Sequence, residues 1–265
     1  MSEVVLPSSG DELPVMRHCP PGPLSRAWTL RAEAVESPAF RARRDAREAS
    51  SGESMGPIVY ASARGSNVVD VDGNLYVDLT AGFGAELLGH HHPRVVAALE
   101  AQAARLWHAL GDVFTADSRI ALMESLAAIF PESGARVILG QAGADAVTAA
   151  LKTALLATSK PGVLAFEGSY HGMSYAPLAA SGLRASYRDP FAAQLSPHVR
   201  FAPYPISSND ADAVLSRCRE VLSKGDIGAV LIEPVLGRGG CFPAPGGFLG
   251  ELASLAARSG ALPDR

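Results

Sequence analysis

The chain has 265 residues, of which 48% are hydrophobic and 19% charged, a composition typical of a globular protein with a sizeable core. Its formal net charge of −4 provides no basic field, which argues against a nucleic-acid partner or an anionic membrane surface. Three scattered cysteines argue against a disulfide framework, and without a signal-peptide pattern or a bilayer-length apolar run we expect a cytoplasmic protein with no membrane partner.

The N-terminal stretch is rich in proline, so residues 1–24 are expected to form a flexible arm. From Ser25 to Ala49 the pattern is helical and strongly charged, and Pro38 predicts a break into two short helices. Arginines and acids alternate along this stretch. The arginines are compatible with a nucleic-acid patch, but the interleaved acids favour a solvated or partner-facing helix face.

A small antiparallel β unit follows these helices. Alternating apolar residues predict strands over 57–60, 67–71 and 75–79, and Asp72–Gly73–Asn74 is typical of a hairpin turn. We expect residues 25–110 to form one region that combines the N-terminal helices with this β unit.

Three adjacent histidines, His90–His92, suggest a metal site at first sight. Neighbouring residues do not share a face of a helix or strand, however, and no spaced histidine pair or carboxylate set completes a ligand sphere. We therefore expect no metal, and interpret the histidines as a turn before a helix over 94–106.

The remainder of the chain has an α/β pattern. Apolar strands over 137–139, 162–166, 198–202 and 229–233 alternate with helices, which predicts a mostly parallel sheet covered on both faces. The helices are expected over 116–130, 141–158, 211–222 and 248–258. In such sheets ligands bind outside the carboxyl ends of the strands. We expect residues 111–265 to form this domain.

The stretch from Gly140 to Ala144 joins a short apolar run to a long Ala-rich helix. A strand that turns through small residues into a helix leaves free backbone N–H groups at the positive end of the helix dipole, which favours an anion. The alternative is a tight turn in which glycine only serves packing, and the turn by itself does not decide between them.

Two further residue groups follow strand ends. Gly168 and Gly172 flank Tyr170 and His171, an aromatic–imidazole pair on a loop, which is either a stacking surface or a packed loop tyrosine. Glu233 ends an apolar strand, so its carboxylate is either part of a structural ion pair or a site residue. A phosphate turn, a stacking surface and a placed carboxylate together suggest a flat, phosphorylated cofactor.

At these residues the chain resembles the class-III aminotransferases, pyridoxal-phosphate (PLP) enzymes of fold type I, and it is similar to the 4-aminobutyrate and ornithine enzymes. Five motifs in the family's order carry the resemblance. They are DVDGN with YVD after Asn67, LGHHHP before Arg94, QAGADA before Val147, FEGSYHG ending at Gly172, and IEPV followed by PAPGGFL ending at Leu249.

The resemblance implies roles for particular residues. Gly143 and Ala144 would bind the cofactor phosphate through backbone N–H groups, Tyr170 would stack on the pyridine ring with His171 beside it, and Glu233 would organise the site. The implied reaction moves an amino group from an amine or amino acid to a 2-oxo acid, in a homodimer.

The sequence departs from the family pattern at several positions. Met173 stands where the 4-aminobutyrate enzymes have a substrate-binding arginine, and Leu236 and Arg238 replace a glutamine and a glutamate. Gln141–Ala142 replaces a polar residue followed by serine. The resemblance alone therefore does not assign the substrate.

The family's later motifs, an Asp that pairs with the pyridine nitrogen and the lysine that forms the Schiff base, have no match. The chain reads Pro263–Asp264–Arg265 instead, and proline is not expected to continue a strand. We therefore expect a C-terminally truncated member with no catalytic residue of its own, inactive alone. The alternatives are an aminomutase or epimerase of the same fold, and a non-catalytic phosphate- or PLP-binding homologue.

Overall fold

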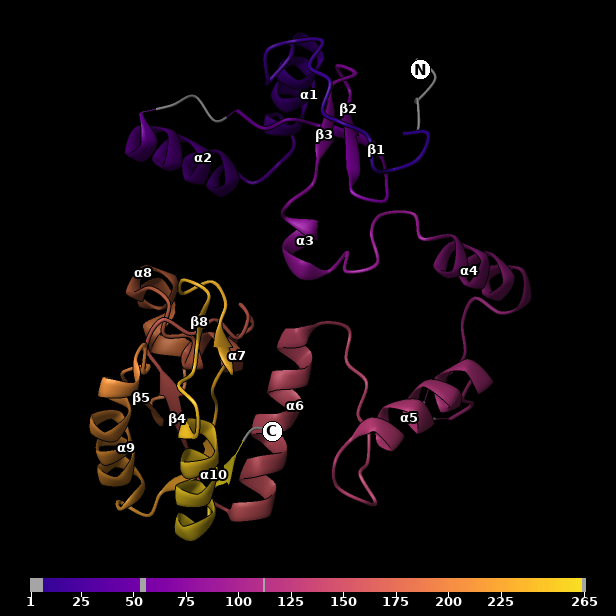
Figure 1. The fold of residues 1–265 in the computed structure, drawn as a ribbon. Helices are drawn as coiled ribbons and strands as arrows, with labels where there is room; N and C mark the ends of the chain where they lie inside the picture. Colours follow the sequence, from indigo (N-terminus) through magenta and orange to yellow (C-terminus); the bar gives the residue numbers. More distant parts are fainter. Residues whose placement is uncertain (1–6, 53–55, 112, 264–265) are drawn as a thin grey trace. The chain divides into compact units, whose positions relative to one another are not determined.

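A computed structural model describes residues 7–52, 56–111 and 113–263 of the chain (Figure 1). The chain divides into two compact units, with the boundary between Ala116 and Asp117. Each unit is described by itself below.

Two helices open the first unit, α1 (Pro23–Glu33) and α2 (Pro38–Ser51). Each begins at a proline, whose missing N–H costs nothing in the first turn of a helix. Pro38 therefore separates the two helices, as the sequence predicted.

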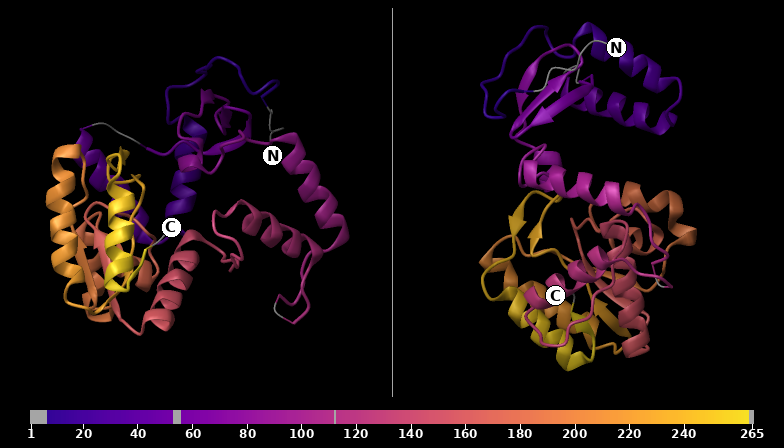
Figure 2. Two further views of the ribbon diagram at one scale, coloured as in Figure 1. Left: turned by 60° about the horizontal axis from the view of Figure 1, so that its bottom comes forward. Right: turned by 90° about the vertical axis from the view of Figure 1, so that its right-hand side faces the viewer.

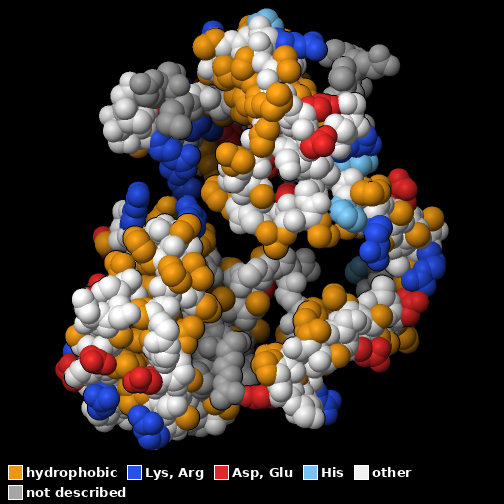
Figure 3. Space-filling view, viewed as in Figure 1, with side chains coloured by type: hydrophobic (Ala, Val, Ile, Leu, Met, Phe, Trp, Pro, Cys, Tyr) orange, Lys and Arg blue, Asp and Glu red, His pale blue; other side chains and the backbone are white. Residues whose placement is uncertain are grey.

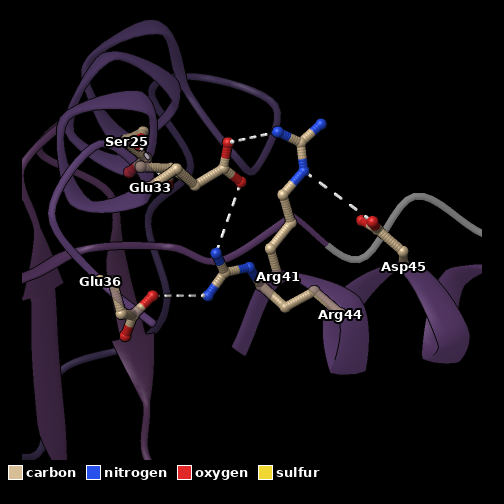
Figure 4. A network of polar contacts seen from close by, with 7 residues as sticks. Ser25, Glu33, Glu36, Arg41, Arg44 and Asp45 are labelled. Carbon is tan, nitrogen blue, oxygen red and sulfur yellow. Dashed lines mark hydrogen bonds and ion pairs between the residues drawn. The ribbon is translucent and has the colours of Figure 1, made fainter. Parts of the chain in front are cut away.

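Arginines of α2 bind acids of the same unit (Figure 4). Arg44 lies 3.4 Å from Glu33 and 3.3 Å from Glu36, and Arg41 lies 3.6 Å from Glu33. Two of the four arginines of α2 thus pair within the unit, and these partly exposed pairs orient α2 against α1 more than they stabilise it.

The antiparallel sheet contains β1 (Tyr60–Arg64), β2 (Asn67–Asp70) and β3 (Leu75–Val77), in that order. The hairpin between β2 and β3 is confirmed. The first strand lies later than the predicted 57–60, because a tight turn between Arg64 and Asn67 fixes the register and places residues 60–64 opposite β2.

A buried polar network holds the turn after β2. The carboxylate of Asp70 accepts hydrogen bonds from the backbone N–H of Asp72 (2.9 Å) and of Asn74 (2.8 Å) and from the Tyr76 hydroxyl (2.7 Å). Burial and this hydrogen bond raise the pKa of Tyr76 to about 12.

Residues 7–22 lie against this sheet, which differs from the flexible arm expected over 1–24. The Asn67 side chain accepts the N–H of Glu12 at 2.7 Å, and the Asn74 side chain accepts the N–H of Arg17 at 2.7 Å. Val15 forms a backbone bridge with Leu75. Side chains of the sheet thus accept hydrogen bonds from backbone N–H groups of a proline-rich segment, which has few helix or strand hydrogen bonds of its own. Residues 1–6 lie outside the described part.

Asp72 caps α1 from a distance in sequence. Its carboxylate accepts the N–H of Leu24 at 2.7 Å and of Ser25 at 2.8 Å, whereas the N-cap residue Gly22 offers no side chain. We expect Asp72→Ala to lower the free energy of unfolding of the first unit by about 1–2 kcal/mol, the usual loss for a removed N-cap. Urea unfolding followed by tryptophan fluorescence measures it, because Trp28 lies in α1.

Asp11→Ala is the control for this substitution, since Asp11 is an exposed acid of the same unit. Its expected effect is within about 0.5 kcal/mol, as for other surface substitutions. Equal losses for the two variants would show that Asp72 does not act as a cap.

The first unit also contains α3 (Ala81–Gly84) and α4 (Pro93–Arg105). His90 lies 2.8 Å from Asp78, and His92 precedes Pro93 as the N-cap residue of α4, so the histidines lie in the turn before this helix. Among the residues that the structure describes, no group of three or more His, Cys, Asp or Glu side chains is placed to hold a metal ion. None of the helices in the described part of the chain is both long and apolar enough to cross a membrane.

The second unit contains a parallel sheet of β4 (Gly162–Phe166), β5 (Val199–Ala202), β6 (Ile227–Val230) and β9 (Leu262–Pro263), in the order β5-β4-β6-β9. The other helices and strands of this unit are α5 (Asp117–Ile129), α6 (Gly143–Thr158), α7 (Tyr175–Ala180), α8 (Ala185–Arg188), the 3₁₀ helix η1 (Asp189–Gln194), α9 (Ser208–Leu222), the β7 (Val235–Leu236) and β8 (Phe242–Pro243) hairpin, and α10 (Phe248–Ser259).

Helices cover both faces of this sheet (Figure 2). On one face, Leu164 and Phe166 of β4 pack with buried residues of α9 and α10, including Cys218 and Leu252. On the other face, Ala165 packs with residues of α6 and α7. Alternate residues of one strand thus enter two cores, which is why its sequence is apolar without interruption.

Three features of this unit correct the sequence-based expectations. Residues 137–139 form no strand, because no described strand runs alongside them to complete a ladder. Leu262–Pro263 does pair with β6, because it lies at the edge of the described sheet, where a missing N–H is tolerated. The connection over 167–197 contains α7, α8 and η1. Asp264, which we did not expect to pair with a pyridine nitrogen, lies outside the described residues.

Apolar side chains of α5 are exposed to solvent, and hydrophobic atoms are visible on this part of the surface (Figure 3). Ile129 is 79% exposed and Leu122 is 48% exposed. The helix itself was predicted over 116–130 and occupies nearly that range.

Candidate functional site

The candidate site lies at the carboxyl ends of β4 and β6. These strands are parallel neighbours, so the loop after Phe166 and the segment after Val230 leave the sheet side by side. The first carries Tyr170 and His171, and the second carries Glu233.

Glu233 joins two loops of this edge. Its Oε1 accepts the backbone N–H of Tyr170 at 2.6 Å, and its Oε2 accepts the backbone N–H of Gly237 at 3.0 Å. A carboxylate that accepts backbone N–H bonds is a strong, charge-assisted acceptor. The sequence left a structural ion pair and a site residue as alternatives for Glu233. No ion pair of Glu233 occurs among the described residues, and its carboxylate instead fixes two loops of this edge.

Tyr204, which sequence reasoning missed, holds the backbone of Glu233 through a hydrogen bond. The residue is 7% exposed, its ring packs edge-on against Phe166, and its hydroxyl donates to the backbone oxygen of Glu233 at 3.1 Å. Burial, together with the negative charge of Glu233, raises the pKa of Tyr204. Its place just after β5 was the available signal.

His171 is held by its backbone and leaves one ring nitrogen unused. Its N–H donates to the hydroxyl of Ser181 at 3.0 Å, and Ser181, also missed from sequence, donates to the oxygen of Pro177 at 2.9 Å in α7. Within the described chain the buried Nε2 of His171 has no hydrogen-bond partner. Burial lowers the pKa of His171, against the opposing charge of Glu233, so the ring is neutral near pH 7.

Gly172 brings this loop against the start of α6. Its φ is +123°, and a Cβ built on it would lie 2.8 Å from the Cβ of Ala144. Only glycine therefore allows this approach. The contact places Tyr170–His171 next to the first turn of α6, two segments that the sequence alone could not bring together.

The first turn of α6 is open. The N-cap residue Ala142 is extended and makes no side-chain cap, and a Cβ at Gly143 would meet nothing within 4 Å. The N–H groups of Gly143 and Ala144 have no acceptor among the described residues, and Asp145 accepts the N–H of Gln141 at 3.1 Å. Free N–H groups at the positive end of a sixteen-residue helix favour a phosphate or another anion.

These features fit one kind of ligand. The open helix N-terminus suits a phosphate, the Tyr170 ring suits a flat ring, and the orphaned Nε2 of His171 suits a polar group. All five residues expected at the site, Gly143, Ala144, Tyr170, His171 and Glu233, belong to one edge of the second unit.

Residues 49–262 match the sequence model of the class-III aminotransferases. The chain belongs to this family. It is 35% identical to the acetylornithine aminotransferase of Methanosarcina mazei over 207 residues, which cover 78% of this chain and 49% of that protein. It is 36% identical to the 4-aminobutyrate aminotransferase of Escherichia coli, covering 75% of this chain and 48% of that protein.

The fold comparison agrees with this membership. A PLP-bound crystal structure of an amine transaminase from an uncultivated Pseudomonas species superposes with a TM-score of 0.70 at 26% identity, covering 78% of this chain and 51% of that one. The predicted fold type I architecture is thus confirmed for part of the fold. The chain spans about half the length of the curated relatives it matches.

Proposed function

We propose that this chain forms the cofactor-binding part of a PLP-dependent aminotransferase, which transfers an amino group from an amine or amino acid to a 2-oxo acid. The contact between Gly172 and Ala144 carries the proposal, because it places an open helix N-terminus beside an aromatic ring and an unpartnered imidazole nitrogen. In this proposal residues 25–110 belong to a smaller domain, and residues 111–265 to the cofactor-binding domain.

Each site residue has a role in this proposal. The N–H groups of Gly143 and Ala144 bind the phosphate, the ring of Tyr170 lies against the pyridine, and His171 offers a neutral Nε2 to a polar group of the ligand. The carboxylate of Glu233 positions Tyr170 by accepting the backbone N–H of Tyr170. When bound, the cofactor supplies an electron-withdrawing ring and an aldehyde that captures amines.

None of the three lysines of the chain lies at this edge. Lys160 and Lys224 precede β4 and β6, at the opposite, amino ends of these strands, and the Nζ of Lys160 donates to the oxygen of Ser259 at 2.7 Å. Lys152 lies nine residues after Gly143, about 14 Å along α6 at 1.5 Å per residue. We therefore propose that this chain alone does not transaminate. From the family to which the chain belongs, we also propose that the complete enzyme is a cytoplasmic homodimer.

Titration of the chain with PLP tests the proposal. We expect saturable binding in the absorbance difference spectrum, and borohydride reduction followed by peptide mapping should find no lysine modified in proportion to the bound cofactor. Stoichiometric modification of one lysine would contradict the inactivity of the chain alone. Absence of saturable binding would contradict the cofactor site.

A further inference from the structure

An arginine lies over the proposed stacking residue. The Cζ of Arg238 is 4.4 Å from the centroid of the Tyr170 ring. A guanidinium at this distance over an aromatic face is attracted to it, and the stacking restricts a side chain that would otherwise sample many rotamers.

The loop that carries Arg238 is fixed on both sides. Before it, the N–H of Gly237 donates to Glu233 at 3.0 Å. After it, Gly239 packs so closely that a Cβ there would lie 2.6 Å from the backbone oxygen of Gly168, on the loop that leads to Tyr170. The two loops therefore hold Arg238 and Tyr170 together as a unit.

Arg238 has no acid to bind in this setting. No carboxylate of the described chain lies within ion-pair distance of it, and the carboxylate oxygens of Glu233 instead accept the backbone N–H groups of Tyr170 and Gly237. Arg238 is also exposed. A guanidinium that stacks through its face keeps the N–H groups at its edge available, in the planar fork that matches a carboxylate.

We propose that Arg238 binds a carboxylate of the substrate and so makes the site select an acidic amino-group donor or acceptor. Tyr170 positions Arg238 through its ring. This inference rests on the proposed function for the identity of the reaction, but it makes a separate claim about carboxylate binding by the chain itself.

Glutarate is a suitable probe, and its uncharged diamide is the control ligand. We expect glutarate to shift the Arg238 Nε–Hε signal in NMR titrations of the full chain, and the diamide to bind at least tenfold more weakly. Arg238→Gln should weaken glutarate binding at least tenfold, and Arg238→Lys should fall between, because the charge remains and the fork is lost. Tyr170→Phe should keep the affinity within about threefold, whereas Tyr170→Ala should weaken it.

The matched control is Arg119→Gln, which removes the same charge from an exposed position on α5 and should leave glutarate binding within twofold. Circular dichroism confirms the fold of each variant. Equal affinity for glutarate and the diamide, or wild-type affinity in Arg238→Gln, would overturn the inference. PLP binding without Arg238-dependent glutarate binding would refute this inference alone, and the reverse result would refute the proposed function alone.

Discussion

The Gly143→Asp variant is expected to fold normally and to lose PLP binding by about 100-fold or more. A Cβ at this position meets nothing within 4 Å, and an acid in the first turn of a helix is favourable to the helix dipole. The same carboxylate would stand where the phosphate binds. Two unit charges about 4 Å apart repel by about 4 kcal/mol at an effective dielectric constant of 20, enough for this loss.

Gly250→Asp is the matched control for this variant. Gly250 lies in the first turn of α10, and a Cβ there also meets nothing within 4 Å. Both variants should show unfolding midpoints at or above that of the wild type, and only Gly143→Asp should lose PLP in the absorbance titration. If both variants bind PLP equally well, the α6 terminus is not the phosphate site.

Glu233→Ala is expected to reduce both stability and PLP affinity. It removes the acceptor of Tyr170 N–H and of Gly237 N–H, and an unsatisfied donor shielded from water costs about 1–3 kcal/mol. The Gly237 N–H is exposed and can bond water instead, so we expect the loss to come mainly from the partly buried Tyr170 N–H: the free energy of unfolding should fall by about 1–3 kcal/mol, and PLP affinity at least tenfold.

Glu233→Gln is expected to cause intermediate losses of stability and of PLP affinity. Its carbonyl oxygen can still accept one N–H, whereas its amide nitrogen cannot accept the other, so its losses should be about half as large in free energy. Asp212→Ala, an exposed acid of α9, serves as control. Urea unfolding measures stability, and the absorbance titration measures affinity. Wild-type behaviour of Glu233→Ala would show that the two loops do not depend on this carboxylate.

The parallel strands were predictable from sequence because both of their faces are buried. The unbroken apolar run that ends at Phe166 shows this, and β4 occupies the expected range, Gly162–Phe166. The run at Val137–Ile138–Leu139 has the same local appearance, yet it forms no strand, since pairing depends on a neighbour that local sequence does not specify. The helices of the 167–197 connection were missed because six residues or fewer give too short a period to recognise.

The site was partly predictable for a similar reason. Gly143, Tyr170 and Glu233 follow elements with clear patterns, and their position at strand or helix ends draws attention to them. Ser181 and Tyr204 support these residues through contacts distant in sequence. Tyr204 could have been noticed because it follows a strand end, whereas nothing in the local sequence distinguishes Ser181 from other loop residues. The stacking of Arg238 on Tyr170 is likewise a property of two loops that only the fold brings together.

The hydrogen bonds from Tyr170 and Gly237 to Glu233 join residues of this chain alone and involve no ligand atom. The conformational entropy of these two loops is therefore lost during folding and not during binding. A ligand that arrives meets a rigid receptor, so its capture rate is set by diffusion and electrostatic attraction, and differences in affinity between ligands arise mainly in how fast they leave.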